Sequence, residues 1–205
     1  MDRRVFNITL NFIAAFGLVL AFCSEKSFAR GSSGGDYAPV LDLGINFYTG
    51  TTGKSLTGST GYFFNFRAED SKGFFRPHAA MELSYSGGQA SIGSDTPSST
   101  MFGAGFLAGV HLFAFSTGRF QPFVGGNGVF AWNYLKMTSP PSGIEPNTEG
   151  LSFGYEASAG VDMRFGSSEG NALRIKSGYW AVTSKLAGMS GFQLSGFRIT
   201  IGIVY

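Results

Sequence analysis

The sequence has little charge and almost no cysteine. Only 14% of its 205 residues are charged, whereas a soluble domain usually carries about 25%. The 15 basic and 13 acidic residues nearly cancel and form no basic cluster, which argues against a nucleic acid partner. What the chain has in abundance is glycine, with 31 residues, and phenylalanine, with 22. These two residue types together indicate tight backbone turns and a large apolar exterior.

The amino terminus has the pattern of a secretory signal peptide. Arg3 and Arg4 precede an apolar run over 12–22, and Ser27 and Ala29 then supply the small residues expected before a cleavage point. The run is shorter than the ~20 residues that a membrane helix requires, but it suits the apolar region of a signal peptide. We therefore predict a signal peptide over residues 1–29 and one barrel domain over residues 30–205.

The single cysteine, Cys23, lies inside the predicted signal peptide. A lipoprotein cysteine is preceded by a small residue, and Phe22 is not small, so this alternative is disfavoured. The domain that remains after cleavage has no cysteine, which excludes a disulfide framework.

The segment LSFGYEASAGVDMRF shows how the domain is built. From Leu151 to Phe165 the odd positions carry apolar residues and alanines, and the even positions carry polar residues and glycine. This period of two predicts a strand, because a helix could not separate the two sets. The same alternation, less regular over 101–115 and 122–134, predicts eight strands, at 41–47, 62–67, 75–85, 101–115, 122–134, 151–165, 173–179 and 197–205.

The expected connections alternate in length. Short segments follow the second, fourth and sixth strands (AEDSKG, STGR, GSSEGN), and longer ones follow the first, third, fifth and seventh. This predicts antiparallel neighbours with short turns at one rim and longer loops at the other, as in outer-membrane barrels.

Alternation alone does not say which face points inward, since a soluble lipocalin-like barrel alternates too. The polar positions, however, carry many glycines and few charges of both signs, which suits a cramped interior. The apolar positions carry aromatic residues near the strand ends, as in the aromatic girdles of membrane barrels. We therefore predict an all-β fold, an eight-stranded antiparallel up-and-down transmembrane β-barrel, closed because an open edge in lipid would leave backbone groups unpaired.

The charged residues of the polar face are predicted to form a network inside the lumen. They are Asp42, Arg67, Arg76, His78, Glu82, His111, Glu156, Asp162, Arg164, Arg174, Lys176 and Arg198. Charges in so narrow a space must be paired, which favours an ion-pair plug over a gate or conduit. Six cations face four carboxylates in this set, so any ion that passed would be expected to be an anion.

The last strand and two internal segments resemble a known family. The closing alternation places Phe197, Ile199, Ile201, Ile203 and Tyr205 on one face and ends on an aromatic residue, like the assembly signal of outer-membrane proteins. GYEASAGVDMRF and PFVGGNG are similar to segments of the small barrels of the OmpA and OmpX type. The resemblance implies a monomer in the cell outer membrane, surrounded by lipid and lipopolysaccharide, which periplasmic chaperones and the barrel-assembly machinery deliver.

The two histidines raise the question of catalysis, because some small outer-membrane barrels are lipid A deacylases with a His-x-Ser element. His78 is followed by Ala79 and Ala80, and His111 by Leu112 and Phe113, so this element is missing. No metal-ligand spacing and no cofactor motif appear in the sequence. We expect no enzymatic activity, no metal and no cofactor.

Three functions remain open from the sequence. The favoured one is a structural or surface-binding role through the outer loops, because loops on a rigid scaffold commonly carry binding function. The first alternative is a narrow channel for small or apolar solutes, supported by Met101, Leu107 and Phe113 on the expected lumen face. The second is an outer-membrane lipid-modifying enzyme.

Overall fold

The computed structural model describes residues 37–50, 56, 58–89, 96–138, 147–165, 171–186 and 189–205. The predicted signal peptide and Cys23 lie outside these residues. No helix in the described part of the chain has the length and apolar character needed to cross a membrane.

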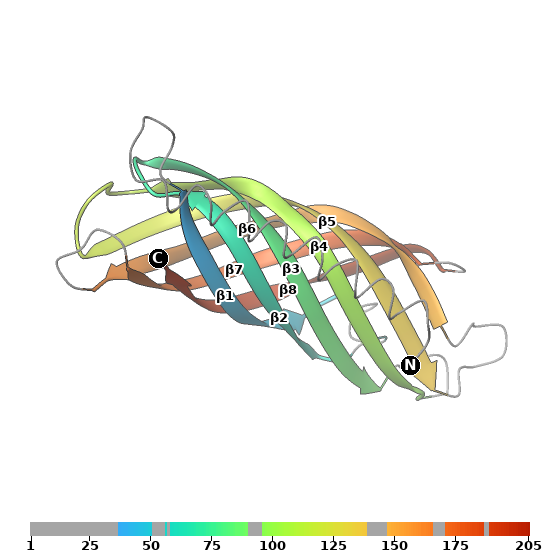
Figure 1. Ribbon diagram of the computed structural model, residues 1–205. Coiled ribbons are helices and arrows are strands. Elements are labelled where there is room, and N and C mark those ends of the chain that lie inside the picture. Colours follow the sequence, from blue (N-terminus) through green and yellow to red (C-terminus); the bar gives the residue numbers. More distant parts are fainter. Residues whose placement is uncertain are drawn as a thin grey trace.

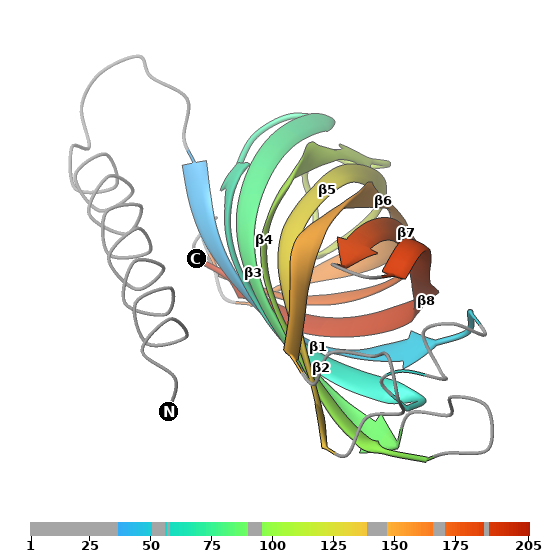
Figure 2. The same ribbon diagram turned by 90° about the vertical axis from the view of Figure 1, so that its right-hand side faces the viewer.

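The described residues form a closed antiparallel barrel of eight strands, each hydrogen-bonded to the next (Figure 1). The last strand pairs with the first, from Val40 opposite Val204 to Tyr48 opposite Gly196, so that no open edge remains along this seam. Figure 2 shows the wall curving around a common axis. The predicted fold class is therefore confirmed. The strands are β1 (Tyr37–Tyr48), β2 (Thr60–Asp70), β3 (Phe75–Gln89), β4 (Ser98–Phe113), β5 (Phe120–Thr138), β6 (Asn147–Arg164), β7 (Ala172–Leu186) and β8 (Met189–Val204).

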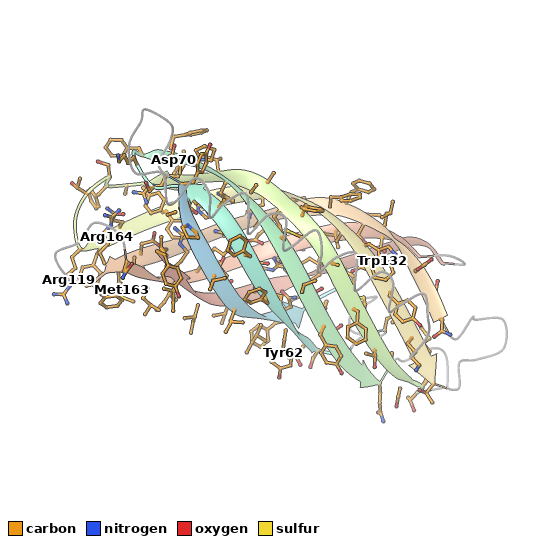
Figure 3. The ribbon with its side chains drawn as sticks, in the orientation of Figure 1. Tyr62, Asp70, Arg119, Trp132, Met163 and Arg164 are labelled. Atoms are coloured by element: carbon orange, nitrogen blue, oxygen red, sulfur yellow. The ribbon has the colours of Figure 1, made fainter. Side chains whose placement is uncertain are left out.

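The connections define two ends of the barrel. At the turn end, β2–β3, β4–β5 and β6–β7 are joined by residues 71–74, 114–119 and 165–171. Gly73 (84°) and Gly118 (116°), in the described turns before β3 and β5, have positive φ, a conformation that disfavours side chains with a Cβ. The connections after β1, β3, β5 and β7 belong to the opposite end, which we call the loop end. Asp70, Arg119 and Arg164 all lie at the turn end, on the left in Figure 3.

Most strands are longer than the alternation predicted. β2 continues through Glu69 to Asp70, so the predicted turn AEDSKG begins too early. β7 and β8 extend until only residues 187 and 188 separate them, so the predicted long connection after the seventh strand is wrong. β4, by contrast, ends at Phe113, before the predicted limit at residue 115. The strands continue past the residues whose side chains alternate between apolar and polar, because the backbone hydrogen bonds between strands do not require apolar side chains.

The apolar face points outward. The predicted outward residues of the last strand are about half exposed, from 47% for Ile203 to 57% for Phe197, whereas Thr200 between them is fully buried. Large exposed apolar side chains recur around the wall; among them are Leu43, Tyr62, Phe75, Leu83, Phe106, Val124, Tyr155 and Ile175. An outward face of this composition suits hydrocarbon and not water.

The interior is filled in layers along the barrel axis. A small apolar cluster lies at the turn-end part of β1, β7 and β8, made of Ala38, Val40, Ala172 and Val204. A larger apolar cluster fills the loop end, made of Tyr48, Leu56, Met101, Leu135, Met137, Trp180, Val182 and Leu194. Charged and polar side chains occupy the space between them, and this middle layer contains the candidate functional site.

Candidate functional site: ion pairs in the lumen

One group of charges is centred on Arg174 of β7. Asp162 faces Arg174 directly across the β6–β7 ladder, and the guanidinium donates from Nε to Oδ1 at 2.7 Å and from Nη2 to Oδ2 at 2.8 Å. The same guanidinium donates from Nη1 and Nη2 to the two oxygens of Glu69, at 2.7 and 2.8 Å. Arg174 therefore joins two carboxylates on opposite sides of the lumen, and its side chain is fully buried.

Glu69 and Arg67 of β2 extend this group to two further strands, β4 and β1. His111 Nδ1 lies 2.8 Å from Glu69 Oε2, and Arg67 Nη1 lies 3.5 Å from His111 Nε2. Since a guanidinium only donates, His111 accepts at Nε2 and donates at Nδ1. Arg67 also donates from Nη2 to Asp42 Oδ2 at 2.8 Å. We call these six residues the Arg174 cluster: Asp42, Arg67, Glu69, His111, Asp162 and Arg174.

A second group lies nearer the loop end, centred on Arg198 of β8. Arg198 Nη1 donates to Glu156 Oε2 at 2.7 Å and to Glu82 Oε2 at 3.0 Å. Its Nε donates to Asn46 Oδ1 at 3.0 Å, and Lys176 Nζ donates to Glu156 Oε1 at 2.9 Å. We call Asn46, Glu82, Glu156, Lys176 and Arg198 the Arg198 cluster.

Aromatic rings flank the cations of both clusters. The Arg174 guanidinium carbon lies 4.8 Å from the centre of the Phe123 ring. Arg76, a buried cation outside both clusters, lies over Phe113 at 3.8 Å. The Arg198 guanidinium lies 4.4 Å from Phe63 and 5.1 Å from Trp180. Cation–π contacts of this kind strengthen when they are desolvated, so the rings both hold the cations and shield them from water.

The structure places ten of the twelve predicted lumen charges in buried positions; they are Asp42, Arg67, Arg76, His78, His111, Glu156, Asp162, Arg174, Lys176 and Arg198. Glu82 is slightly more exposed but bonds to Arg198. Arg164, the last residue of β6, is half-buried at the turn-end rim.

Glu69 is the important residue that the sequence analysis missed. The alternation places it in a turn, yet it contributes the carboxylate that Arg174 and His111 share. The sequence did contain a sign of its role, because Glu69 follows Asn65 and Arg67 on alternate positions of β2 and therefore shares their inward face. With Glu69 counted and Arg164 set aside at the rim, five cations (Arg67, Arg76, Arg174, Lys176, Arg198) meet five carboxylates (Asp42, Glu69, Glu82, Glu156, Asp162) among the described residues. The excess of lumen cations, from which we expected any passing ion to be an anion, is therefore absent from this set.

Inward glycines provide the room for these side chains. Gly202 lies opposite Asp42 on the β1–β8 ladder, and an added Cβ there would overlap Asp42 Oδ1 and lie 2.9 Å from the Leu41 carbonyl oxygen. Gly202→Ala is therefore expected to lower the free energy of unfolding by about 1–3 kcal/mol, measured by urea titration of the protein folded in lipid vesicles. Gly126→Ala is the matched control, because its Cβ would meet nothing closer than 3.8 Å on the outer face. Equal effects of both changes would contradict tight packing around Asp42.

Glu69, His78 and His111 also form the one group of potential metal ligands found among the described residues, with ligand atoms within 4.8 Å of one another. Two of these residues already face internal partners, because Arg174 and His111 bond to Glu69 and Arg67 approaches His111 Nε2. His78 Nε2 donates to Asn127 Oδ1, so the electron pair of His78 Nδ1 is the one that remains free in this group. A divalent cation would lie beside two guanidinium groups in a poorly hydrated space, which is strongly unfavourable. The residues therefore do not fit a metal site.

Comparison with known proteins identifies the fold. No protein-family model matches the sequence, and no curated protein is significantly similar to it. Among solved structures the chain is similar to neisserial surface protein A, with 12% identity, 84% of this chain and 98% of that chain covered, and a TM-score of 0.57. The outer membrane enzyme PagL (10% identity, 80% and 97% covered, TM-score 0.40) and a major outer membrane protein from Thermus thermophilus (9%, 82% and 99%, 0.43) also match.

The likeness to neisserial surface protein A, together with the closed eight-stranded barrel and its apolar exterior, shows the fold of a small outer-membrane barrel. The predicted resemblance and the predicted outer-membrane location are thereby confirmed at the level of the fold. In such barrels the short turns face the periplasm, so the turn end of this chain is its periplasmic end.

Proposed function

We propose that this chain is a non-catalytic structural protein of the outer membrane, with a closed lumen and with outer loops that contact partners at the cell surface. The observation that carries this proposal is the lumen itself. The side chains of the Arg174 cluster are at most 2% exposed and are joined across the barrel. A rigid, filled barrel is a scaffold and an anchor, and loops on such scaffolds commonly carry the binding function.

The arrangement supports a plug better than a conduit. An ion that entered the Arg174 cluster would have to separate buried pairs whose mutual attraction offsets a desolvation cost of several kcal/mol per charge. The loop-end apolar cluster lies beyond the charges, so the path between the two rims crosses layers of opposite character.

The channel for apolar solutes has weaker support. Met101, Leu107 and Phe113 are buried on the inward face of β4. They lie in different layers, however, since Met101 belongs to the loop-end apolar cluster and Phe113 packs against Arg76 at the turn end. The charged clusters interrupt the apolar surface between them.

The proposal predicts that the protein does not conduct. Reconstituted in planar bilayers at neutral pH, it is expected to show no steady open current, because buried ion pairs occupy the middle of the lumen. Arg198→Ala, which removes the ion pair of Glu82 and leaves Glu156 with Lys176 alone, is expected to give detectable openings by loosening the Arg198 cluster. A stable open current from the unaltered protein would contradict the closed lumen.

The absence of catalysis is part of the proposal. Both imidazoles bond to other lumen side chains, His78 to Asn127 and His111 to Glu69, and this supports a structural role for them. Lipid A extracted from cells that produce the protein is expected to match lipid A from cells without it. A changed acylation pattern that His78→Gln or His111→Gln abolishes would instead establish an enzyme.

Assembly is the remaining part of the proposal. The outward face of β8, which ends with Ile203 and Tyr205, suits recognition by periplasmic chaperones and the barrel-assembly machinery. After insertion the same face would contact outer-membrane lipid and lipopolysaccharide. Since the barrel closes on itself through β1 and β8, a single copy needs no partner to complete its sheet, which supports a monomer.

A further inference from the structure

Six buried polar atoms in the middle of the lumen have no protein partner. Each belongs to a residue that is more than nine-tenths buried, and each residue lies on a different strand. They are Asp42 Oδ1, Arg67 Nε, His78 Nδ1, Asn127 Nδ2, Ser158 Oγ and Thr200 Oγ1.

The strand register places these residues next to one another around the barrel. Asp42 bonds to Arg67, and Arg67 pairs with Ala80, two residues from His78 on the same face of β3. His78 bonds to Asn127 across Gly109, which faces both residues. Gly109 allows this contact, because a Cβ there would overlap Asn127 Oδ1.

The strand pairing from β5 through β8 leads from Asn127 back to Asp42. Asn127 pairs with Glu156, two residues from Ser158 on the same face of β6. Ser158 pairs with Gly178, two residues from Lys176, and Lys176 pairs with Thr200. Thr200 in turn pairs with Gly44, two residues from Asp42. The six atoms therefore belong to one ring of neighbouring residues around the lumen.

Six orphaned atoms are too many to leave unsatisfied. Each buried polar atom without a hydrogen bond costs roughly 1–3 kcal/mol, and a whole domain is stable by only about 5–15 kcal/mol. Native proteins satisfy nearly all such atoms with protein groups or with bound molecules. The ring therefore requires a hydrogen-bonding occupant.

The chemistry of the ring defines that occupant. Arg67 and Asn127 offer donors, Asp42 offers an acceptor, and the hydroxyls of Ser158 and Thr200 can do either. The five buried cations and five carboxylates around the ring already balance, so an ion of either sign would bring an uncompensated charge into a space of low dielectric constant.

We propose that the ring lines a polar chamber that binds small uncharged hydrogen-bonding molecules, with water as the resident occupant, and that it rejects ions. Buried waters of this kind typically make about three hydrogen bonds to otherwise unsatisfied groups. The chamber is lined on one side by Asp42 and Arg67 of the Arg174 cluster, it adjoins Lys176 of the Arg198 cluster, and the loop-end apolar cluster lies beyond it. It is therefore a closed compartment inside the plug.

The substitution Thr200→Val tests for the bound water, because the presence or absence of that water determines whether stability falls or rises. If Thr200 Oγ1 bonds to a bound water, loss of the hydroxyl is expected to lower the folded-to-unfolded equilibrium constant by about fivefold. If the site is dry, removal of an orphaned hydroxyl leaves the constant unchanged or raises it, and that result overturns the proposal. The constant is measured by urea titration in lipid vesicles. Thr183→Val, on the exposed face of β7, is the matched control for the same chemical change.

A second measurement does not depend on a variant that folds. In nuclear magnetic resonance spectra of the protein in lipid nanodiscs, magnetisation transfer from long-lived water is expected at the side-chain amide of Asn127. No transfer to this buried group would contradict the resident water. Titration with Zn²⁺ tests the rejection of ions, and saturable binding that His78→Ala abolishes would overturn it.

Discussion

Replacement of Arg174 by methionine is expected to lower the free energy of unfolding by about 3–5 kcal/mol. Methionine keeps much of the side-chain volume but removes the cation that neutralises both Glu69 and Asp162. Two carboxylates then remain buried without their main partner, and this residual charge dominates the cost. No comparable loss is expected for Arg119→Met, because Arg119 is exposed in the turn before β5.

A triple variant distinguishes whether Arg174→Met lowers stability through uncompensated charge or through lost packing. When Glu69→Gln and Asp162→Asn accompany Arg174→Met, the uncompensated charges disappear, and stability is expected to return most of the way to that of the unaltered protein. Urea titration in lipid vesicles compares the three proteins and the Arg119→Met control. A triple variant as unstable as the single variant would show that packing around Arg174, and not charge, carries the effect.

The second large effect is expected on the lipid face. Ile201 is 56% exposed on the outer face of β8, beside Thr200 and at the level of the polar ring. Ile201→Arg is therefore expected to cost about 2–4 kcal/mol, the cost of a cation near the middle of the bilayer in a β-barrel.

The same change near the rim should cost much less. Tyr37 is exposed at the first residue of β1, at the turn end, so Tyr37→Arg is expected to cost about 0–1 kcal/mol. Equal costs for Ile201→Arg and Tyr37→Arg in the same vesicles would contradict the position of Ile201 within the hydrocarbon.

The strands and their orientation could be predicted because barrel strands repeat one simple rule. Large apolar residues alternate with polar residues and glycine, and the direction of each face follows from glycine on one parity and aromatic residues near the ends of the other. The last strand is the clearest example, with Ile201 outward and Thr200 inward. Strand ends were less predictable, because polar residues such as Glu69 serve equally well in a turn or in the lumen.

The partners within the lumen could not be predicted from one sequence. Arg174 and Glu69 are 105 residues apart, and they meet only because the tilt of the strands brings opposite walls to the same level. The pair of Asp162 and Arg174 was easier to predict, since the two residues lie on consecutive strands. The orphaned atoms of Asp42, His78 and Thr200 could be recognised only after every bond of the lumen was assigned.

The orientation of the strands, with the apolar face toward lipid and the polar face toward the lumen, underlies both the ion-pair network and the closed lumen. Single cysteines placed in turn at positions 197 to 204, labelled with a fluorophore and exposed to lipids that carry a quencher in the acyl chain, test it directly. Strong quenching is expected at the odd positions, which include Ile199 and Ile201, and weak quenching at the even positions, which include Arg198 and Thr200. Strong quenching at the even positions, or no alternation at all, would contradict the barrel orientation described for this protein.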